Sequence, residues 1–485
     1  MAVGFYTSRV ILNVLGVQDF GIYNVVGGVV AMIGLLKGAM TSATMRFITF
    51  ELGRKDFEQL RKTYCISVMI YFLICVVFVL FAETIGLWFL NTQLTIPYDR
   101  MMAANWVYQC TIISIFLEML CQPYHSVVIA HEMMSFYSIV SIVEVLLKLL
   151  FVSILAYISF DSLIVYGGLM MVVSLVISLS YHFFCKTKFS ECNFKIYHDK
   201  ELFKKMLSYS GWNLFGSAAS LVKSQGLNIL LNMFFNPVVN AARGISYQIN
   251  AAVSQFSHNF YTAVRPQITK YYAQDDYENM FELVFRSSKM SFYLNLILGV
   301  PLLIGAYDFI YLWLGQVPDY TIEFSRLIIL VSLIDAMAHP LMTSIHATGH
   351  VAFYQFVVGS MYILNLPVSY LFLKLGYPPI TVFYISLIIS ILNLFIRLII
   401  LKHYITSFPL LKYISNVFGV CTLVSVLSFI IPAIVFYSFV NSVNSFIWVC
   451  IVSVSSVIIT VYIVGLKNEE RKFVNNILLK RLLHR

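Results

Sequence analysis

The sequence predicts an all-α, polytopic membrane protein with about 14 transmembrane helices. Hydrophobic residues make up 60% of the chain, charged residues make up 11%, and the mean hydropathy is +0.83. A soluble protein of 485 residues cannot bury that much apolar surface in one core, whereas lipid solvates it. The apolar runs are also continuous and lack the polar alternation of membrane-barrel strands, which favours helices.

Apolar runs of membrane-spanning length follow one another along the whole chain. The expected spans centre on residues 1–14, 21–45, 63–84, 103–122, 134–157, 162–184, 208–234, 239–262, 290–312, 324–346, 352–373, 377–399, 413–438 and 445–465. The first run is shorter than the roughly 20 residues that a span requires. We therefore expect a truncated or damaged first helix, the alternative being a short helix in a locally thinned bilayer.

Basic residues gather in alternate connections between these spans. Most of the 32 Lys and Arg residues lie in residues 50–64, 184–206, 264–290 and 397–412 and in the C-terminal tail. By the positive-inside rule these five segments are cytoplasmic, which places both termini in the cytoplasm. The net charge of +9 then reflects topology and contact with anionic lipid, so no nucleic-acid partner is implied.

Features that would indicate an enzyme or a metalloprotein are missing from the sequence. No Walker, nucleophile-elbow or metalloprotease motif occurs, and the longest outer connection, about residues 85–102, is too short for a catalytic domain. The eight cysteines give no disulfide framework, and Cys185, Cys192 and His198 match no zinc spacing. We therefore expect neither catalysis nor a metal site.

A basic, amphipathic segment separates two halves of the chain that resemble one another. The tripeptides ILN at 11–13 and LLN at 230–232 have the same offset as Arg46 and Arg265. An even number of spans separates the copies, which predicts parallel repeats related by an axis along the membrane normal. We expect an N-terminal six-helix bundle, a cytoplasmic linker forming a surface helix, a C-terminal six-helix bundle, two further helices and a basic tail, over residues 1–184, 185–206, 207–400, 412–465 and 466–485.

Charged residues inside the spans are the candidates for a functional site, because each costs roughly 2.5–3.5 kcal/mol at a helix centre. Lys37 and Lys223 lie several turns from a helix end beside polar or glycine residues, so we expect them to line an aqueous cavity. Glu144 and Lys148 lie one turn apart on one helix face. They form either a self-neutralising ion pair or a cavity cation held by its carboxylate.

Two further pairs are candidates for substrate binding and ion coupling. Arg9 and Arg243 flank the repeated tripeptides, and their guanidinium groups suit the oxygens of a pyrophosphate. Asp335 and His339 lie one turn apart just before Pro340, where a carboxylate and an imidazole beside a kink can relay protons. A buried, hydrogen-bonded pair without a transport role is the alternative.

Three segments carry a family resemblance: TSRVILNVLGVQDFGIYNVVGGVV from Thr7, ATMRFITFELGRKD, and NPVVNAARGISYQINAAVSQF. They resemble the Wzx-like polysaccharide flippases of the multidrug/oligosaccharidyl-lipid/polysaccharide (MOP) superfamily, which export O-antigen and other lipopolysaccharide repeat units. The resemblance implies two helical bundles around a cationic cavity in a bacterial inner membrane. It also implies a polyprenyl-pyrophosphate-linked oligosaccharide as substrate, membrane lipids as surroundings and polysaccharide polymerase machinery as a possible partner.

The expected function is therefore translocation of a lipid-linked oligosaccharide by alternating access, with no cofactor beyond a coupling ion such as H+ or Na+. Arg9, Lys37, Lys148, Lys223 and Arg243 would hold the headgroup, and Asp335, His339 and Glu144 would couple the ion. The alternatives are a multidrug exporter of the same fold, a membrane polymerase or glycosyltransferase, and an inactive truncated copy. The surplus of basic over acidic residues within the spans disfavours an exporter of cationic drugs.

Overall fold

The computed structural model describes residues 15, 19, 22–23, 26, 34–92, 96–155, 160–235, 237–438, 443–468, 470–472 and 475. Over these residues the chain consists of helices joined by short turns, without a strand, so the predicted all-α class is confirmed. Within the described residues, ten helices are long and apolar enough to cross a membrane, which confirms a multi-span membrane protein. The first predicted span lies almost entirely outside the described residues. The chain forms two compact units, 1–217 and 218–485.

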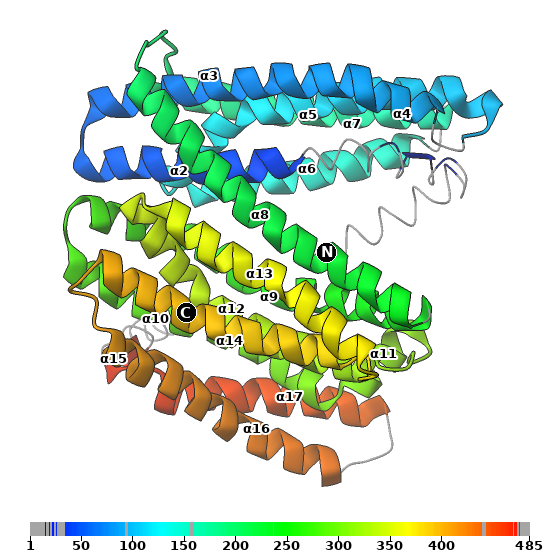
Figure 1. Ribbon diagram of the computed structural model, residues 1–485, viewed down its shortest axis with the longest axis vertical. Coiled ribbons are helices and arrows are strands. Elements are labelled where there is room, and N and C mark those ends of the chain that lie inside the picture. Colours follow the sequence, from blue (N-terminus) through cyan, green and yellow to red (C-terminus); the bar gives the residue numbers. More distant parts are fainter. Residues whose placement is uncertain are drawn as a thin grey trace, which may run out of the picture. The chain divides into compact units, whose positions relative to one another are not determined.

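Unit 1 contains long helices that follow the predicted spans and extend beyond several of them (Figure 1). They are α2 (Gly34–Arg54), α3 (Phe57–Phe81), α5 (Met101–Ala130), α6 (Met134–Leu155) and α7 (Ser162–Lys188). A π-helical turn, Ala82–Gly86, joins α3 to the short α4 (Leu87–Thr92). The central helix is α5, which packs against α2, α3, α6 and α7.

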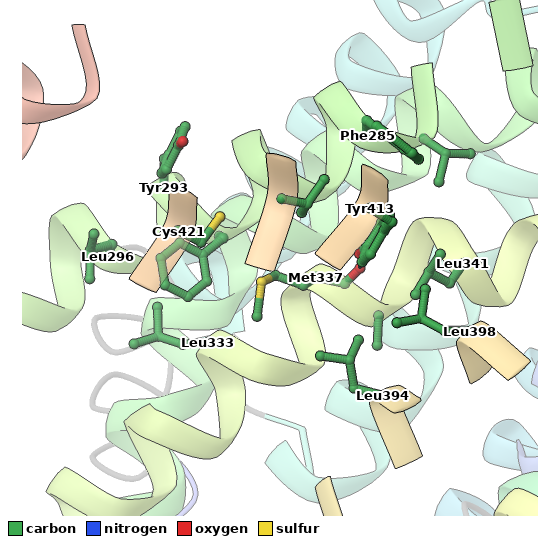
Figure 2. Packing of buried hydrophobic residues seen from close by; sticks show 14 of the residues in the cluster. Phe285, Tyr293, Leu296, Leu333, Met337, Leu341, Leu394, Leu398, Tyr413 and Cys421 are labelled. Carbon is green, nitrogen blue, oxygen red and sulfur yellow. The ribbon is translucent and has the colours of Figure 1, made fainter. Parts of the chain in front are cut away.

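Unit 2 is built mainly from helices of similar length. They are α9 (Pro237–Ala273), α10 (Tyr277–Ile304), α12 (Thr321–Thr348), α13 (Val351–Lys374), α14 (Thr381–Tyr404), α16 (Val420–Ser438) and α17 (Val443–Thr460), with short helices α11 (Ala306–Leu314) and α15 (Leu410–Tyr413). Its core lies where α10, α12, α14 and α16 meet, around Tyr293, Met337, Leu398 and Tyr413 (Figure 2). The hydroxyl of Tyr413 donates to the carbonyl oxygen of Met337 at 3.1 Å, so this buried polar group is satisfied.

The segment predicted as a surface helix does not form one. Helix α7 continues to Lys188, a 3-10 turn covers Ser190–Cys192, and residues 193–199 are irregular. Helix α8 (Lys200–Phe234) then begins inside the predicted linker and continues from unit 1 into unit 2. The residues before Lys200 follow an irregular chain instead, and Phe194 of this chain lines one apolar groove together with Phe203 of α8.

The internal repeat reappears as local geometry at the turns before α3 and α10. Lys55 and Asp275 both have positive φ, 58° and 56°, and each precedes an aspartate N-cap. Asp56 accepts from the backbone N–H of Gln59, and Asp276 does the same from Asn279. Equivalent caps fix equivalent starting points for the two helices, so residues of α3 and α10 can be compared position by position.

Candidate functional site

Unit 2 contains a polar cavity of about 330 Å³ between α8, α9, α10, α12, α13 and α14. The residues around it that carry charge or can titrate are His258, Asp335, His339 and Arg397, and serines, asparagines and Tyr362 complete much of the polar wall. Polar side chains are expensive within a span unless they face water or one another. The cavity is therefore the main candidate for a functional site in unit 2.

The carboxylate of this cavity is held by a serine of the neighbouring helix. Ser390 Oγ on α14 donates to Asp335 Oδ1 on α12 at 2.5 Å. His339 stacks on the ring of Tyr261, with 5.0 Å between ring centroids. Asp335 and His339 thus line one cavity as the sequence predicts, but the hydrogen bond of Asp335 goes to Ser390. Their proposed part in ion coupling remains a prediction.

The structure places a buried arginine in the same cavity, which the sequence analysis assigned to a cytoplasmic segment. Arg397 lies within α14, is 5% exposed, and donates from Nε to Tyr354 Oη at 3.2 Å and from Nη2 to Tyr362 Oη at 3.1 Å. The assignment of Arg397 to the connection 397–412 was wrong, because α14 continues to Tyr404. A signal was available, since Ser386, Ser390, Asn393 and Arg397 recur at helical spacing and form one polar face.

The two basic candidates of α8 and α9 differ in what they contact. The ammonium of Lys223 lies 5.1 Å from the centroid of the Tyr362 ring and interacts electrostatically with Asp335 and Arg397. Arg243, by contrast, donates to the carbonyl oxygen of Ser224 at 2.6 Å and to Asn228 Oδ1 at 3.3 Å. Lys223 therefore belongs to the cavity cluster, whereas the guanidinium of Arg243 braces α9 against α8.

Unit 1 contains a second polar cavity, of about 280 Å³, between α5, α6 and α7. The predicted pair is present there, with Lys148 Nζ 2.5 Å from Glu144 Oε1. Glu118 on α5 is a second carboxylate, and Ser174 Oγ on α7 donates to its Oε1 at 3.4 Å. His125 also lines the cavity. The described lining of the unit 1 cavity therefore contains two carboxylates and one lysine.

Two of the predicted site residues cannot be placed. Arg9 lies outside the described residues. Lys37 belongs to α2, but the position of its side chain is outside the described part of the structure. Of the five predicted headgroup ligands, Lys148 and Lys223 are thus associated with cavities, and they belong to different units.

Helices α8 and α9 are long, with 35 and 37 residues, yet neither is apolar enough to count among the ten candidate spans. On α9, Gln248, Gln255, His258 and Asn259 are exposed. Amide side chains do not face hydrocarbon without a partner, so this surface requires water or a polar ligand. A polar, membrane-length surface of this kind is typical of a transport pathway.

Comparison with known proteins identifies the family and the fold. The model of the polysaccharide biosynthesis protein family matches residues 1–272. No curated protein matches the chain in sequence.

Solved structures with the same fold are MATE transporters. An outward-facing multidrug resistance MATE family transporter of the MOP superfamily has a TM-score of 0.69 at 14% identity, covering 84% of this chain and 92% of the other. A MATE in complex with MaD3S has a TM-score of 0.66 at 12% identity, with coverages of 82% and 96%. The MATE transporter ClbM in complex with Rb+ has a TM-score of 0.63 at 13% identity, with coverages of 82% and 91%. At these identities the similarity establishes the fold. Because one family model matches more than half of its length, the chain belongs to the polysaccharide biosynthesis protein family.

Proposed function

We propose that this protein is a flippase that moves polyprenyl-pyrophosphate-linked oligosaccharides across the inner membrane of a bacterium by alternating access. The products would serve lipopolysaccharide, O-antigen or capsule synthesis, with the basic connections and both termini in the cytoplasm. The protein carries out transport rather than bond chemistry. Polysaccharide polymerase machinery is the proposed partner downstream.

The observation that carries this proposal is the cation surplus of the unit 2 cavity. Arg397 and one carboxylate, Asp335, belong to the described lining of this cavity, and the ammonium of Lys223 lies against the ring of Tyr362 in the same lining. An arginine fixed by two tyrosine hydroxyls presents its remaining N–H groups in a fixed plane, which suits the oxygens of a phosphate. Retaining two basic groups inside a membrane span is costly, and an anionic headgroup would offset that cost. Lys37, Lys148 and Arg9 are further proposed contacts, and Arg243 is proposed to orient α8.

The exposed amides of α9 support the same substrate. Each amide both donates and accepts hydrogen bonds, as sugar hydroxyl groups do. Gln255 Nε2 donates to Asn259 Oδ1 at 2.9 Å, so two amides one turn apart form a single polar surface. The sugar chain would lie against this wet surface while the polyprenyl tail stays in lipid.

Ion coupling would use the carboxylates of both cavities. Asp335 with His339 in unit 2 and Glu144 in unit 1 are the proposed residues, with H+ or Na+ as the ion. Each carboxylate already lies beside a group that can compensate its charge, namely Arg397 or Lys148. Binding or release of a cation would therefore change the net charge of its cavity by one unit.

A multidrug exporter is the second candidate, and the unit 1 cavity favours it. Two carboxylates, Glu118 and Glu144, line that cavity, and carboxylates are the groups that suit an organic cation. The two functions can be told apart by the ligand that binds, because a flippase of this kind binds an anionic headgroup and a multidrug exporter of this kind binds an organic cation.

Competition between the two substrates tests the proposal. The purified protein in detergent is mixed with polyprenyl-pyrophosphate-linked sugar and with an organic cation such as ethidium, and native mass spectrometry records the bound species. We expect the lipid-linked sugar to bind and Arg397→Gln to weaken it by about 30-fold, since hydrogen bonds of charged groups contribute about 1.5–3 kcal/mol. Binding of ethidium alone, unaffected by Arg397→Gln, would establish the exporter instead.

A further inference from the structure

An apolar groove runs along α3 on the surface of unit 1. Its volume is about 640 Å³, and all its lining residues are apolar. One wall is formed by Met69, Phe72, Leu73 and Val76 of α3, and Phe194 and Phe203 of the 193–206 region form the other. Because Phe194 and Phe203 come from a different part of the chain, the groove is a built feature and more than the ordinary surface of one lipid-facing helix.

A polar pocket of about 490 Å³ is lined by Lys62, which lies on α3 two turns before Met69 of the groove. Tyr197, His198, Lys200 and Glu201 line it together with Asp199. At 100° per residue, Lys62 lies on the same face of α3 as Met69, Leu73 and Val76. The charged pocket therefore lies toward the N-terminal end of α3 from the apolar groove, and α3 and the stretch from 194 to 203 contribute residues to both.

The repeat-related helix of unit 2 has the same face fully covered. Counting from the matching N-caps, Phe72 and Val76 of α3 correspond to Phe292 and Leu296 of α10. Phe72 and Val76 are 56% and 40% exposed, whereas Phe292 and Leu296 are 5% and 2% exposed. Helices α16 and α17 pack on α10, and α3 has no such cover among the described residues.

We propose that the groove and its polar pocket bind one glycerophospholipid of the leaflet that faces the Arg61–Lys62 end of α3, with an acyl chain along Met69–Val76 and the phosphate between Lys62 and Lys200. The distance along the helix from Lys62 to Val76 is about 21 Å. Half of a bilayer with its headgroups is roughly 20–22 Å. The site thus has the length and polarity of a lipid confined to one leaflet, and a polyprenyl chain would extend beyond it.

The way in which α10 is covered in unit 2 shows why the groove on α3 suits a lipid better than another pair of helices. They are fixed by polar contacts: Lys289 Nζ donates to the carbonyl oxygen of Gly465 and to Glu470, each at 3.1 Å, and Tyr293 Oη donates to the same carbonyl at 3.3 Å. The corresponding residues of α3 are Met69 and Leu73, which can make no such bonds. An acyl chain can pack against these apolar residues without any hydrogen bond.

Filling the groove tests the acyl-chain contact. Val76→Trp places an indole in the groove, and Val77→Trp makes the same change on the next residue, which is equally exposed at 42% and lies outside the groove. Native mass spectrometry of the full-length protein, titrated with phosphatidylglycerol, measures the bound fraction. We expect Val76→Trp to raise the dissociation constant by about tenfold while Val77→Trp leaves it within about twofold.

The headgroup contact is tested in the same titration. Lys200→Gln should weaken phosphatidylglycerol binding by about fivefold, and Lys186→Gln, an exposed lysine at the end of α7, should not. Equal binding by the Val76→Trp and Val77→Trp proteins would overturn the proposal. So would displacement of the phospholipid by polyprenyl phosphate or retention of a partner membrane protein that Val76→Trp releases. None of these results depends on the transported substrate, so the proposed function is judged separately.

Discussion

The two cavities occupy equivalent places in the two units but differ in the charged residues that line them. Glu118 precedes Pro123 in α5 by the same spacing as Asp335 precedes Pro340 in α12, and a serine from the last long helix of each bundle, Ser174 or Ser390, donates to the carboxylate. Repetition has therefore preserved a carboxylate–serine pair beside a proline in both units. What differs is the set of charges around that pair.

Two helical turns beyond the serine, the two cavities are lined by different side chains. Tyr181 of α7 lines the unit 1 cavity where the corresponding region of α14 contributes Arg397 to unit 2. Unit 1 adds a second carboxylate, Glu144, with its partner Lys148. The two units therefore share a carboxylate–serine pair and differ in the groups around it, which are Glu144 and Lys148 in unit 1 and Arg397 in unit 2.

The largest expected effect is that of removing the arginine that distinguishes unit 2. Arg397→Gln should lower the rate of lipid-linked oligosaccharide transport by about 100-fold, because it removes the charge and leaves two buried tyrosine hydroxyls to rearrange. Arg397→Lys should restore part of the rate while keeping the charge. Both rates are measured in proteoliposomes with a fluorescent lipid-linked sugar. If Gln and Lys variants transport equally well, the charge of unit 2 has no role in transport.

The next effect concerns the paired carboxylates. Glu118→Gln should leave substrate binding within about twofold but reduce the stimulation of transport by a proton or sodium gradient about tenfold, because it removes one of the two carboxylates that line the unit 1 cavity. Asp335→Asn should instead tighten binding of the anionic headgroup, since it removes the only carboxylate facing Arg397 in the described lining of that cavity. Native mass spectrometry measures substrate binding by each variant, and transport assays under imposed ion gradients measure ion coupling. The reverse pattern would exchange the roles of the two cavities.

The predicted ion pair of α6 should affect stability more than transport. Glu144→Gln and Lys148→Met each leave a lone charge in a span, and each should lower the thermal unfolding midpoint by about 2–4 °C. The double variant should recover most of that loss, because it removes both charges. In unit 2 the counterpart of Lys148 is Asn365, whose neutral amide bonds to Ser386, so this pair is a feature of unit 1 alone. Additive losses in the double variant would mean that the two charges act independently.

Apolar runs and basic connections were enough to predict the fold class and most helices, because the bilayer fixes helix length and polarity. The cavities were harder to predict. Lys223 and Asp335 stand out as isolated charges in apolar runs, whereas Arg397 lies near a helix end among basic residues and resembles a flanking charge. The partners Tyr354 and Tyr362 come from another helix, and no local pattern pairs them with Arg397. Which charges share a cavity depends on packing between helices far apart in sequence.

The smallest expected effect lies at the turns that end α5 and α12. In unit 1, His131 follows α5 and its Nε2 lies 2.6 Å from Glu191 Oε1, whereas in unit 2 His350 stacks on Tyr404. Burial acts to raise the pKa of Glu191, but hydrogen bonds from His131 and from a backbone N–H outweigh it, so the pKa lies below its usual value.

A depressed carboxyl pKa stabilises the fold above the unfolded value of about 4.3, and that stabilisation is lost as pH falls through the lower, folded value. Glu191→Gln should therefore reduce the free energy of unfolding by about 1 kcal/mol near pH 6, with the difference from the unaltered protein shrinking below about pH 4. Thermal unfolding of both proteins from about pH 6 to about pH 4 measures this difference in stability. Glu278→Gln serves as the control, because Glu278 is exposed in the first turn of α10. A difference that grows at low pH would mean that Glu191 is protonated in the folded protein, and the unit 1 turn would then be held by a neutral hydrogen bond instead of an ion pair.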